Sequence, residues 1–149
     1  MRRYIVLDTF LMGMAAAFLM SSSLLAQAQA PSKSSAQPAT EVLWLGQAGF
    51  RIKSPGGKAI LIDPWITGGP KTPAIYKNDL SAIGPIDLLL VTHAHVDHIG
   101  DAPALAKMNN TKLYGPADMV TPLITLGILP ADLGHRFNKT GRVTPLPGI

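Results

Sequence analysis

The sequence predicts an α/β fold, and three features carry that prediction. Short apolar runs typical of strands alternate along the chain with segments whose apolar residues recur at helical spacing. Turn-forming clusters rich in Gly, Pro and Ser separate the runs. The chain has 149 residues and no internal repeat, which leaves room for one domain at most. Ser, Pro, Ala and Gln dominate the stretch before Glu41, so folded structure is expected to begin at that residue.

Three strands are predicted at the start of the domain, and the second and third of them form a hairpin. Residues 42–45 (VLWL) are expected to form a buried strand, and residues 50–53 (FRIK) alternate as a half-exposed one. Ser54-Pro55-Gly56-Gly57 supplies the turn, and residues 58–63 return as the partner strand. Residues 68–85 are rich in Gly, Pro and polar residues, which predicts a surface loop.

The second half of the predicted domain contains a further strand, then helices and strands in alternation. The apolar run at residues 86–91 predicts a buried strand, and residues 101–108 predict a short helix. Residues 112–114 are expected to form a strand closed by Gly115-Pro116. Met119, Leu123 and Leu126 recur at helical spacing, and Pro122 indicates that this helix is either kinked or late-starting.

Residues 92–101, THAHVDHIGD, contain three of the four histidines and directly follow the predicted strand at 86–91. Neutral imidazole and carboxylate are preferred ligands of zinc and neighbouring transition metals. Side chains two apart in an extended segment point the same way, so His93 and His95 are expected to grip one ion. Asp97 and His98 can turn toward a second ion close by. The cluster predicts a metal-dependent hydrolase; the alternative is a polar loop with incidental histidines.

Four other residues have two possible roles each. Asp63 is either a turn-capping aspartate or a carboxylate that fixes the orientation of a ligand histidine through a hydrogen bond. Asp101 is expected to cap a helix that begins at Ala102-Pro103, rather than to bind metal. His135 is expected to be a plain surface histidine in a polar loop, with recruitment as a third ligand as the alternative. Trp44 and Trp65 are interpreted as core and loop-anchoring aromatics rather than substrate platforms.

The pattern H-x-H-x-D-H-x-G after a hydrophobic strand resembles the signature of the metallo-β-lactamase superfamily. Residues 42–50 and 60–65, with the ending Gly100-Asp101, resemble the branch that contains ascorbate-phosphate lactonase. The resemblance runs from about Glu41 to the last residue, and many relatives carry His where this chain has Gln47. It implies an αββα sandwich and one or two Zn²⁺ ions, or another divalent transition metal. It also tilts Asp63 toward the role of supporting a ligand histidine.

The resemblance implies the chemistry of the site as well. A metal-activated water would attack a lactone, ester or amide bond. Asp97 would ligate the second metal, orient the nucleophile and carry a proton as a general acid/base. A phosphodiesterase or nuclease of the same superfamily is a weaker alternative.

The predicted ligands make only part of such a site. A catalytic zinc needs three protein ligands and an open position, whereas His93 with His95, and Asp97 with His98, supply two each. In the superfamily the remaining ligands lie downstream, so the chain is expected to be a fold truncated to its N-terminal half. One sheet face would then lack its cover, which predicts weak stability or aggregation. A non-catalytic fragment with a partial metal site is the alternative to a hydrolase.

The N-terminal residues predict export. Residues 1–28 have the basic start, apolar run and small-residue cleavage context of a signal peptide, followed by a flexible linker at 29–40 and the domain at 41–149. A periplasmic or secreted location follows; an uncleaved membrane anchor is the alternative. The net charge of +4 is dispersed, which disfavours nucleic acid but suits a small, anionic substrate. The absence of cysteine excludes disulfides and thiolate ligands.

Overall fold

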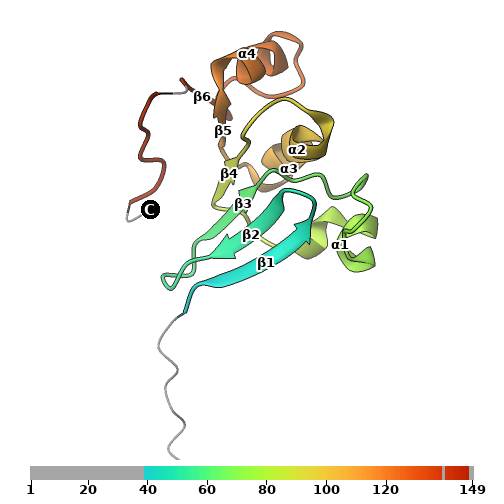
Figure 1. Cartoon of the computed structure of the whole chain (residues 1–149). Helices are drawn as coiled ribbons and strands as arrows, with labels where there is room; N and C mark the ends of the chain where they lie inside the picture. Colours follow the sequence, from blue (N-terminus) through green and yellow to red (C-terminus); the bar gives the residue numbers. More distant parts are fainter. Residues whose placement is uncertain (1–38, 139, 148–149) are drawn as a thin grey trace, which may run out of the picture. The chain divides into compact units, whose positions relative to one another are not determined.

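The computed structural model describes residues 39–138 and 140–147. It contains one six-stranded sheet in which the strands follow one another in chain order (Figure 1). The strands are β1 (Glu41–Gly46), β2 (Gly49–Lys53), β3 (Ala59–Ile62), β4 (Leu88–Leu90), β5 (Leu113–Pro116) and β6 (Gly134–Phe137). Strands β1 to β3 pair antiparallel, and β3 to β6 pair parallel. The predicted α/β class is confirmed.

Helices connect the parallel strands and lie on one face of the sheet (Figure 1). They are α1 (Ala74–Asn78), the 3₁₀ helix η1 (Leu80–Ile83), α2 (Val96–Ile99), α3 (Ala102–Asn109) and α4 (Ala117–Thr125). Right-handed crossovers between neighbouring parallel strands place successive helices on the same side. The core forms where this helical layer meets the sheet, around the fully buried Leu61, Leu89 and Leu113.

The opposite face of the sheet is also apolar. The strand register aligns one residue from each strand in a single row, namely Trp44, Phe50, Ile62, Leu90, Tyr114 and His135. In the part of the chain that the structure describes, no helix covers this face. Trp44 and Val42 are 51% and 63% exposed, so the prediction of a buried first strand is wrong. A strand packed on one face only must alternate in burial, and residues 42–45 of β1 do so.

Trp44 anchors a turn rather than filling the core. Its indole nitrogen donates to the carbonyl of Gln47 across the β1–β2 turn at 3.0 Å. Gln47 has a positive φ of 49°, and Gly46 before it has a φ of 99°. A Cβ at Gly46 would lie 2.9 Å from the backbone nitrogen of Thr72, so only glycine fits there. The expectation that Trp44 belongs to the core is therefore wrong, and its indole fixes the β1–β2 turn instead.

The β2–β3 hairpin forms as predicted. Phe50 pairs with Ile62 and Lys53 with Ala59, so each strand lies within one residue of its expected range. The turn between them includes Gly57, whose φ of 83° suits a residue without a side chain.

The predicted surface loop at residues 68–85 contains two short helices instead, α1 and η1. Pro73 precedes α1, and the carboxylate of Asp79 accepts a hydrogen bond from the backbone nitrogen of Ser81 at the start of η1. Apolar residues then attach the segment to the core: Ile83 is buried, and Tyr76 and Leu80 pack against the cluster. The sequence did not predict these helices, because the few apolar residues lie among many Gly, Pro and polar residues.

The later elements match the predictions more closely, with two differences. Helix α3 lies within one residue of the expected range, and β5 extends through Gly115-Pro116. Helix α4 begins at Ala117 and continues through Pro122, so a late start is wrong. His135 lies in β6, paired with Tyr114 of β5, and not in a loop. Pairing with an existing sheet edge makes even this short polar segment a strand.

The predicted signal peptide at residues 1–28 lies outside the described residues, as does the linker at 29–40 up to residue 38. Within the described ranges, no helix combines the length and hydropathy needed to cross a bilayer.

The carboxylate of Asp87, directly before β4, predicts that the stability of the fold depends on pH. Asp87 contacts the ammonium group of Lys58 at 2.8 Å and accepts from the backbone nitrogen of Ala59 at 2.9 Å. These contacts, the Lys58 hydrogen bond first, lower the pKa of Asp87 below its usual 3.8. Because the folded-state pKa is depressed, the contribution is complete above the unfolded pKa and is lost as pH falls through the folded one.

We therefore expect Asp87→Asn to lower the free energy of unfolding by about 0.5–1 kcal/mol at pH 7, since both partners are partly solvent-screened. The difference from wild type should begin to shrink as pH drops below about 4 and vanish only below the depressed pKa of folded Asp87. Urea denaturation at several pH values measures it. Glu41→Gln, in the exposed Lys53–Glu41 pair, is the matched control and should change little. A difference that persists at low pH would show that the ionised carboxylate of Asp87 is not its cause.

Candidate metal centre

The histidine motif begins where β4 ends, at the carboxyl edge of the parallel strands. His93 lies between bends at Thr92 and Ala94, and His95 is the N-cap residue of α2. The Nε2 atom of His93 lies 3.0 Å from the Nδ1 atom of His95, and the two rings meet edge to face at 4.6 Å. Both nitrogen atoms therefore face the same point, as the two-residue spacing suggests.

Asp63 supports the motif from the loop that follows β3. Its carboxylate is 3% exposed, and its Oδ2 atom accepts a hydrogen bond from the Nδ1 atom of His98 at 2.9 Å. Its Oδ1 atom accepts from the backbone nitrogen of Thr92 at 2.7 Å. The backbone of Asp63 has a φ of 44°, a conformation in which Asp and Asn are enriched. With Nδ1 used in this way, His98 keeps Nε2 available for a ligand.

Asp97 lies in the first turn of α2, where its carboxylate is 40% exposed. Its Oδ2 atom is 3.7 Å from the Nε2 atom of His98, so these two groups could share a cation. The ring of His98 lies 4.0 Å from that of His93, centroid to centroid. The four predicted ligands are thus brought together at one edge of the sheet.

The donor set fits a divalent metal in part. Two nitrogen ligands of a tetrahedral zinc, each about 2.05 Å from the ion, lie about 3.3 Å apart. The 3.0 Å between His93 Nε2 and His95 Nδ1 is close to that value. Among the residues that the structure describes, however, no group of three or more His, Asp or Glu side chains is arranged to hold an ion. The site is a pair of histidines beside a His–Asp pair.

Thr92 is a site residue that sequence reasoning missed. Its hydroxyl lies 2.8 Å from Asp63 Oδ2 and 3.0 Å from His93 Nδ1. A hydroxyl residue directly before the first histidine is the only local signal for this contact, and such a signal has many structural explanations.

Asp101 precedes α3 as predicted, but its carboxylate makes no capping hydrogen bond. It accepts instead from the backbone nitrogens of Ile66 and Thr67, at 2.5 and 2.9 Å, and from the Thr67 hydroxyl at 2.7 Å. The capping expectation is therefore wrong in its chemistry. Three donors in the loop after β3 satisfy this buried charge better than the helix end would.

The indole of Trp65 fills the space between this loop and the motif. A Cβ at Gly100 would lie 2.6 Å from the Trp65 ring, and one at Gly68 would lie 2.3 Å from it. Only glycine permits such close approach from both sides. The loop after β3 is thus fixed to the end of α2 by Asp101 and Trp65, which confirms the loop-anchoring role expected for Trp65.

We expect Asp101→Ala to lower the free energy of unfolding by about 2–3 kcal/mol, because three donors lose a buried charged acceptor. Chemical denaturation measures the change. Asp132→Ala, at an exposed turn position, is the control and should stay within about 0.5 kcal/mol of wild type. Equal stability of the two variants would exclude an anchoring role for Asp101.

His135 is not part of the cluster. It stacks on Tyr114 with ring centroids 4.8 Å apart, on the open face of the sheet. The alternative of a third metal ligand therefore finds no support in its position.

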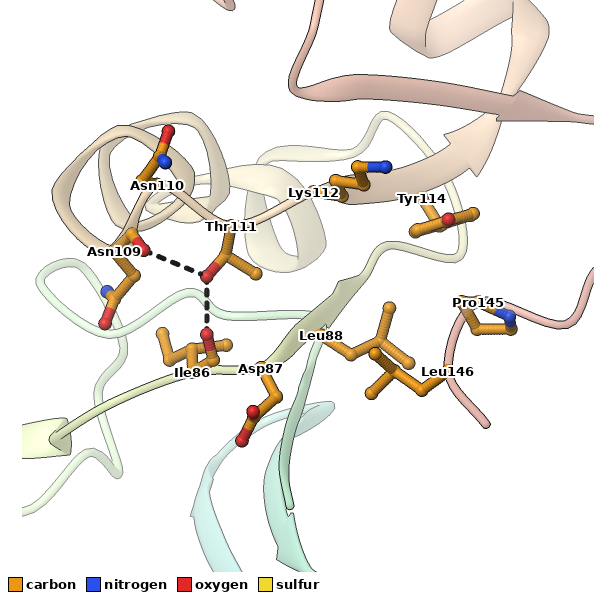
Figure 2. A pocket seen from close by; sticks show the side chains of 10 residues that line it. All are labelled: Ile86, Asp87, Leu88, Asn109, Asn110, Thr111, Lys112, Tyr114, Pro145 and Leu146. Carbon is orange, nitrogen blue, oxygen red and sulfur yellow. Dashed lines mark hydrogen bonds between the residues drawn. The ribbon is translucent and has the colours of Figure 1, made fainter. Parts of the chain in front are cut away.

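A separate cavity of about 300 Å³ lies at the other end of β4 and β5 (Figure 2). It is lined by residues just before or at the start of these strands, and by Pro145 and Leu146. Figure 2 shows Thr111 among the lining residues, and its hydroxyl donates to the carbonyl of Ile86 at 2.5 Å. Ligands of open α/β sheets bind outside the carboxyl ends of the strands, so the histidine edge is the better candidate site.

Residues 58–147 match the family model described as the Beta-lactamase superfamily domain. The matched range includes Asp63 and the whole histidine motif. The chain belongs to the β-lactamase superfamily. As a member of that superfamily, it has the metallo-β-lactamase type of α/β fold that its motif resembles.

The chain is also similar to relatives that are named metal-dependent hydrolases. It is 76% identical over 134 residues to a UPF0173 metal-dependent hydrolase of Polynucleobacter asymbioticus, across 90% of this chain and 47% of the relative. It is 56% identical over 117 residues to one from Polaromonas, across 76% of this chain and 42% of the relative. The chain spans about half the length of the curated relatives it matches.

A solved structure adds support for the fold. Igni18, a novel metallo hydrolase from the archaeon Ignicoccus hospitalis, matches 70% of this superfamily member with 30% identity and a TM-score of 0.55. The match covers 42% of the Igni18 chain.

Proposed function

We propose that this chain carries part of the metal site of a metal-dependent hydrolase that cleaves lactone, ester or amide bonds. The observation that carries the proposal is the convergence of His93 Nε2 and His95 Nδ1, 3.0 Å apart, at the carboxyl edge of β4. Zinc is the metal we propose, because imidazole and carboxylate oxygen suit it and the chain offers no thiolate.

Each residue of the cluster has a distinct task in this proposal. His93 and His95 would hold one ion, and His98 with Asp97 would contribute to a second position. A metal bound there would supply a water of lowered pKa as the nucleophile at neutral pH. Asp97, being partly exposed, can take up a proton at Oδ2 and return it to the leaving group. Asp63 keeps His98 oriented through its Nδ1 hydrogen bond.

The rest of the proposal concerns substrate and location. A small, anionic substrate suits the net charge of +4. Export to the periplasm or the exterior is proposed from the basic start and apolar run of residues 1–28.

Zinc titration of the purified chain, with a competing chromophoric chelator, tests the metal part. We expect the double variant His93→Ala/His95→Ala to lose affinity by more than the roughly 10- to 100-fold typical of outer hydrogen-bonding partners. His135→Ala removes a histidine outside the cluster and is the matched control. Equal affinity of the double variant and the control would overturn the proposal.

A second candidate function is metal binding without turnover. It is favoured by the lack, among the described residues, of a three-ligand group that could hold an ion. A panel of lactones, esters and amides, assayed with the zinc-loaded chain, separates the two. Hydrolysis that disappears in the double histidine variant supports the hydrolase, whereas tight zinc binding with no hydrolysis supports the second candidate.

A further inference from the structure

Thr92 lies at the centre of the hydrogen-bond network behind the motif. Its hydroxyl oxygen is 2.8 Å from Asp63 Oδ2, 3.0 Å from His93 Nδ1 and 3.3 Å from His98 Nδ1. Its backbone nitrogen donates to Asp63 Oδ1 at 2.7 Å. One side chain thus contacts His93, His98 and the carboxylate of Asp63.

The single proton of the Thr92 hydroxyl can go to only one partner. An ionised carboxylate only accepts, so the 2.8 Å contact with Asp63 Oδ2 requires Thr92 to donate there. The lone pairs of the hydroxyl oxygen then face the ring of His93. The 3.0 Å contact with His93 Nδ1 therefore requires that nitrogen to carry the hydrogen and donate.

This arrangement determines which nitrogen of each ring remains free. His93, protonated at Nδ1, presents the lone pair of Nε2 toward His95. His98 donates from Nδ1 to Asp63 Oδ2, and the same nitrogen lies 3.3 Å from the Thr92 hydroxyl oxygen. The Nε2 lone pair of His98 therefore also remains free. The ring nitrogen that binds a metal is set by the hydrogen bond that the other nitrogen makes.

We propose that Thr92 is a positioning residue: with Asp63 it fixes His93 as the Nδ1–H tautomer and so presents His93 Nε2 to the metal. The role of this tautomer in metal binding rests on the proposed function, but the tautomer itself is a property of the metal-free chain. Thr92 need not touch the metal or the substrate.

Nitrogen-15 NMR of the imidazole rings in the metal-free chain, at a pH where the histidines are neutral, tests the tautomer. We expect His93 to be Nδ1–H in wild type and in Thr92→Ser, which keeps the hydroxyl. In Thr92→Val, which has the same shape without the hydroxyl, the His93 signals should shift toward Nε2–H. An Nε2–H form of His93 in the wild-type chain overturns the proposal, whether or not Thr92→Val folds.

Zinc titration of the same three proteins gives the second measurement. Thr92→Val should bind zinc about 10- to 100-fold more weakly than wild type, and Thr92→Ser should recover most of that loss. Valine and serine variants with equal, near-wild-type affinity would overturn the positioning role. A wild-type chain with the Nδ1–H tautomer but no zinc binding would refute the proposed function and leave the tautomer assignment standing.

Discussion

Asp63→Ala is expected to destabilise the fold by about 3–5 kcal/mol and to weaken zinc binding by about 10- to 100-fold. The carboxylate is 3% exposed and accepts three hydrogen bonds, from the Thr92 nitrogen, the Thr92 hydroxyl and His98 Nδ1. Removing it leaves these donors without their charged acceptor. Alanine must also adopt a φ of 44°, which adds strain of order 1 kcal/mol.

Asp63→Asn separates the backbone effect from the charge effect. Asparagine tolerates the left-handed conformation and can still accept from the Thr92 nitrogen. Its amide nitrogen cannot accept from Thr92 Oγ1 or from His98. The loss of stability should therefore be smaller than in Asp63→Ala, whereas the loss of zinc affinity should be similar.

Urea denaturation and chelator-competed zinc titration measure these two effects, with Asp132→Ala as the exposed control. If Asp63→Ala unfolds within about 0.5 kcal/mol of wild type, the network behind the motif is not formed in solution.

The sequence predicts those parts of the fold that depend on neighbours in the chain. The β2–β3 hairpin follows from alternating side chains around a Gly-rich turn, and the start of α3 follows from Pro103 in its first turn. The proximity of His93 and His95 agrees with the two-residue spacing from which it was predicted. All of these depend on residues within a few positions of one another.

Contacts between distant segments could not be predicted with the same detail. Asp101 lies beside a helix start, where capping is the usual role, yet its partners Ile66 and Thr67 are 35 and 34 positions away. Thr92 reaches Asp63 across 29 positions. Such contacts depend on the parallel pairing of β3 with β4, which brings the ends of both strands to one edge.

Burial depends on the layers of the fold as well as on the apolar pattern. Residues 42–45 are almost entirely apolar, which predicts a strand covered on both faces. The described helices cover one face only, so Leu45 is buried while Trp44 is 51% exposed. The same reasoning makes Leu89 and Leu90 energetically unequal, although the sequence, a run of three leucines, does not distinguish them.

Leu89→Ala is expected to lower the free energy of unfolding by about 2–5 kcal/mol. Leu89 is fully buried in the core between the sheet and the helices. Leu90 is its matched control, because it has the same side chain on the same strand but points to the open face, where it is only half-buried. Leu90→Ala should cost about 1 kcal/mol, since less apolar surface leaves the protein interior.

The comparison of Leu89→Ala with Leu90→Ala cancels the change in strand propensity, which is the same for both. Urea denaturation of the two variants therefore measures the difference between the two faces of the sheet directly. Equal losses would mean that the open face is covered in solution as well as the helical face is. The unequal losses expected here would show that Leu89 contributes more to stability than Leu90, and that contacts with the helical layer stabilise β4, two residues before Thr92.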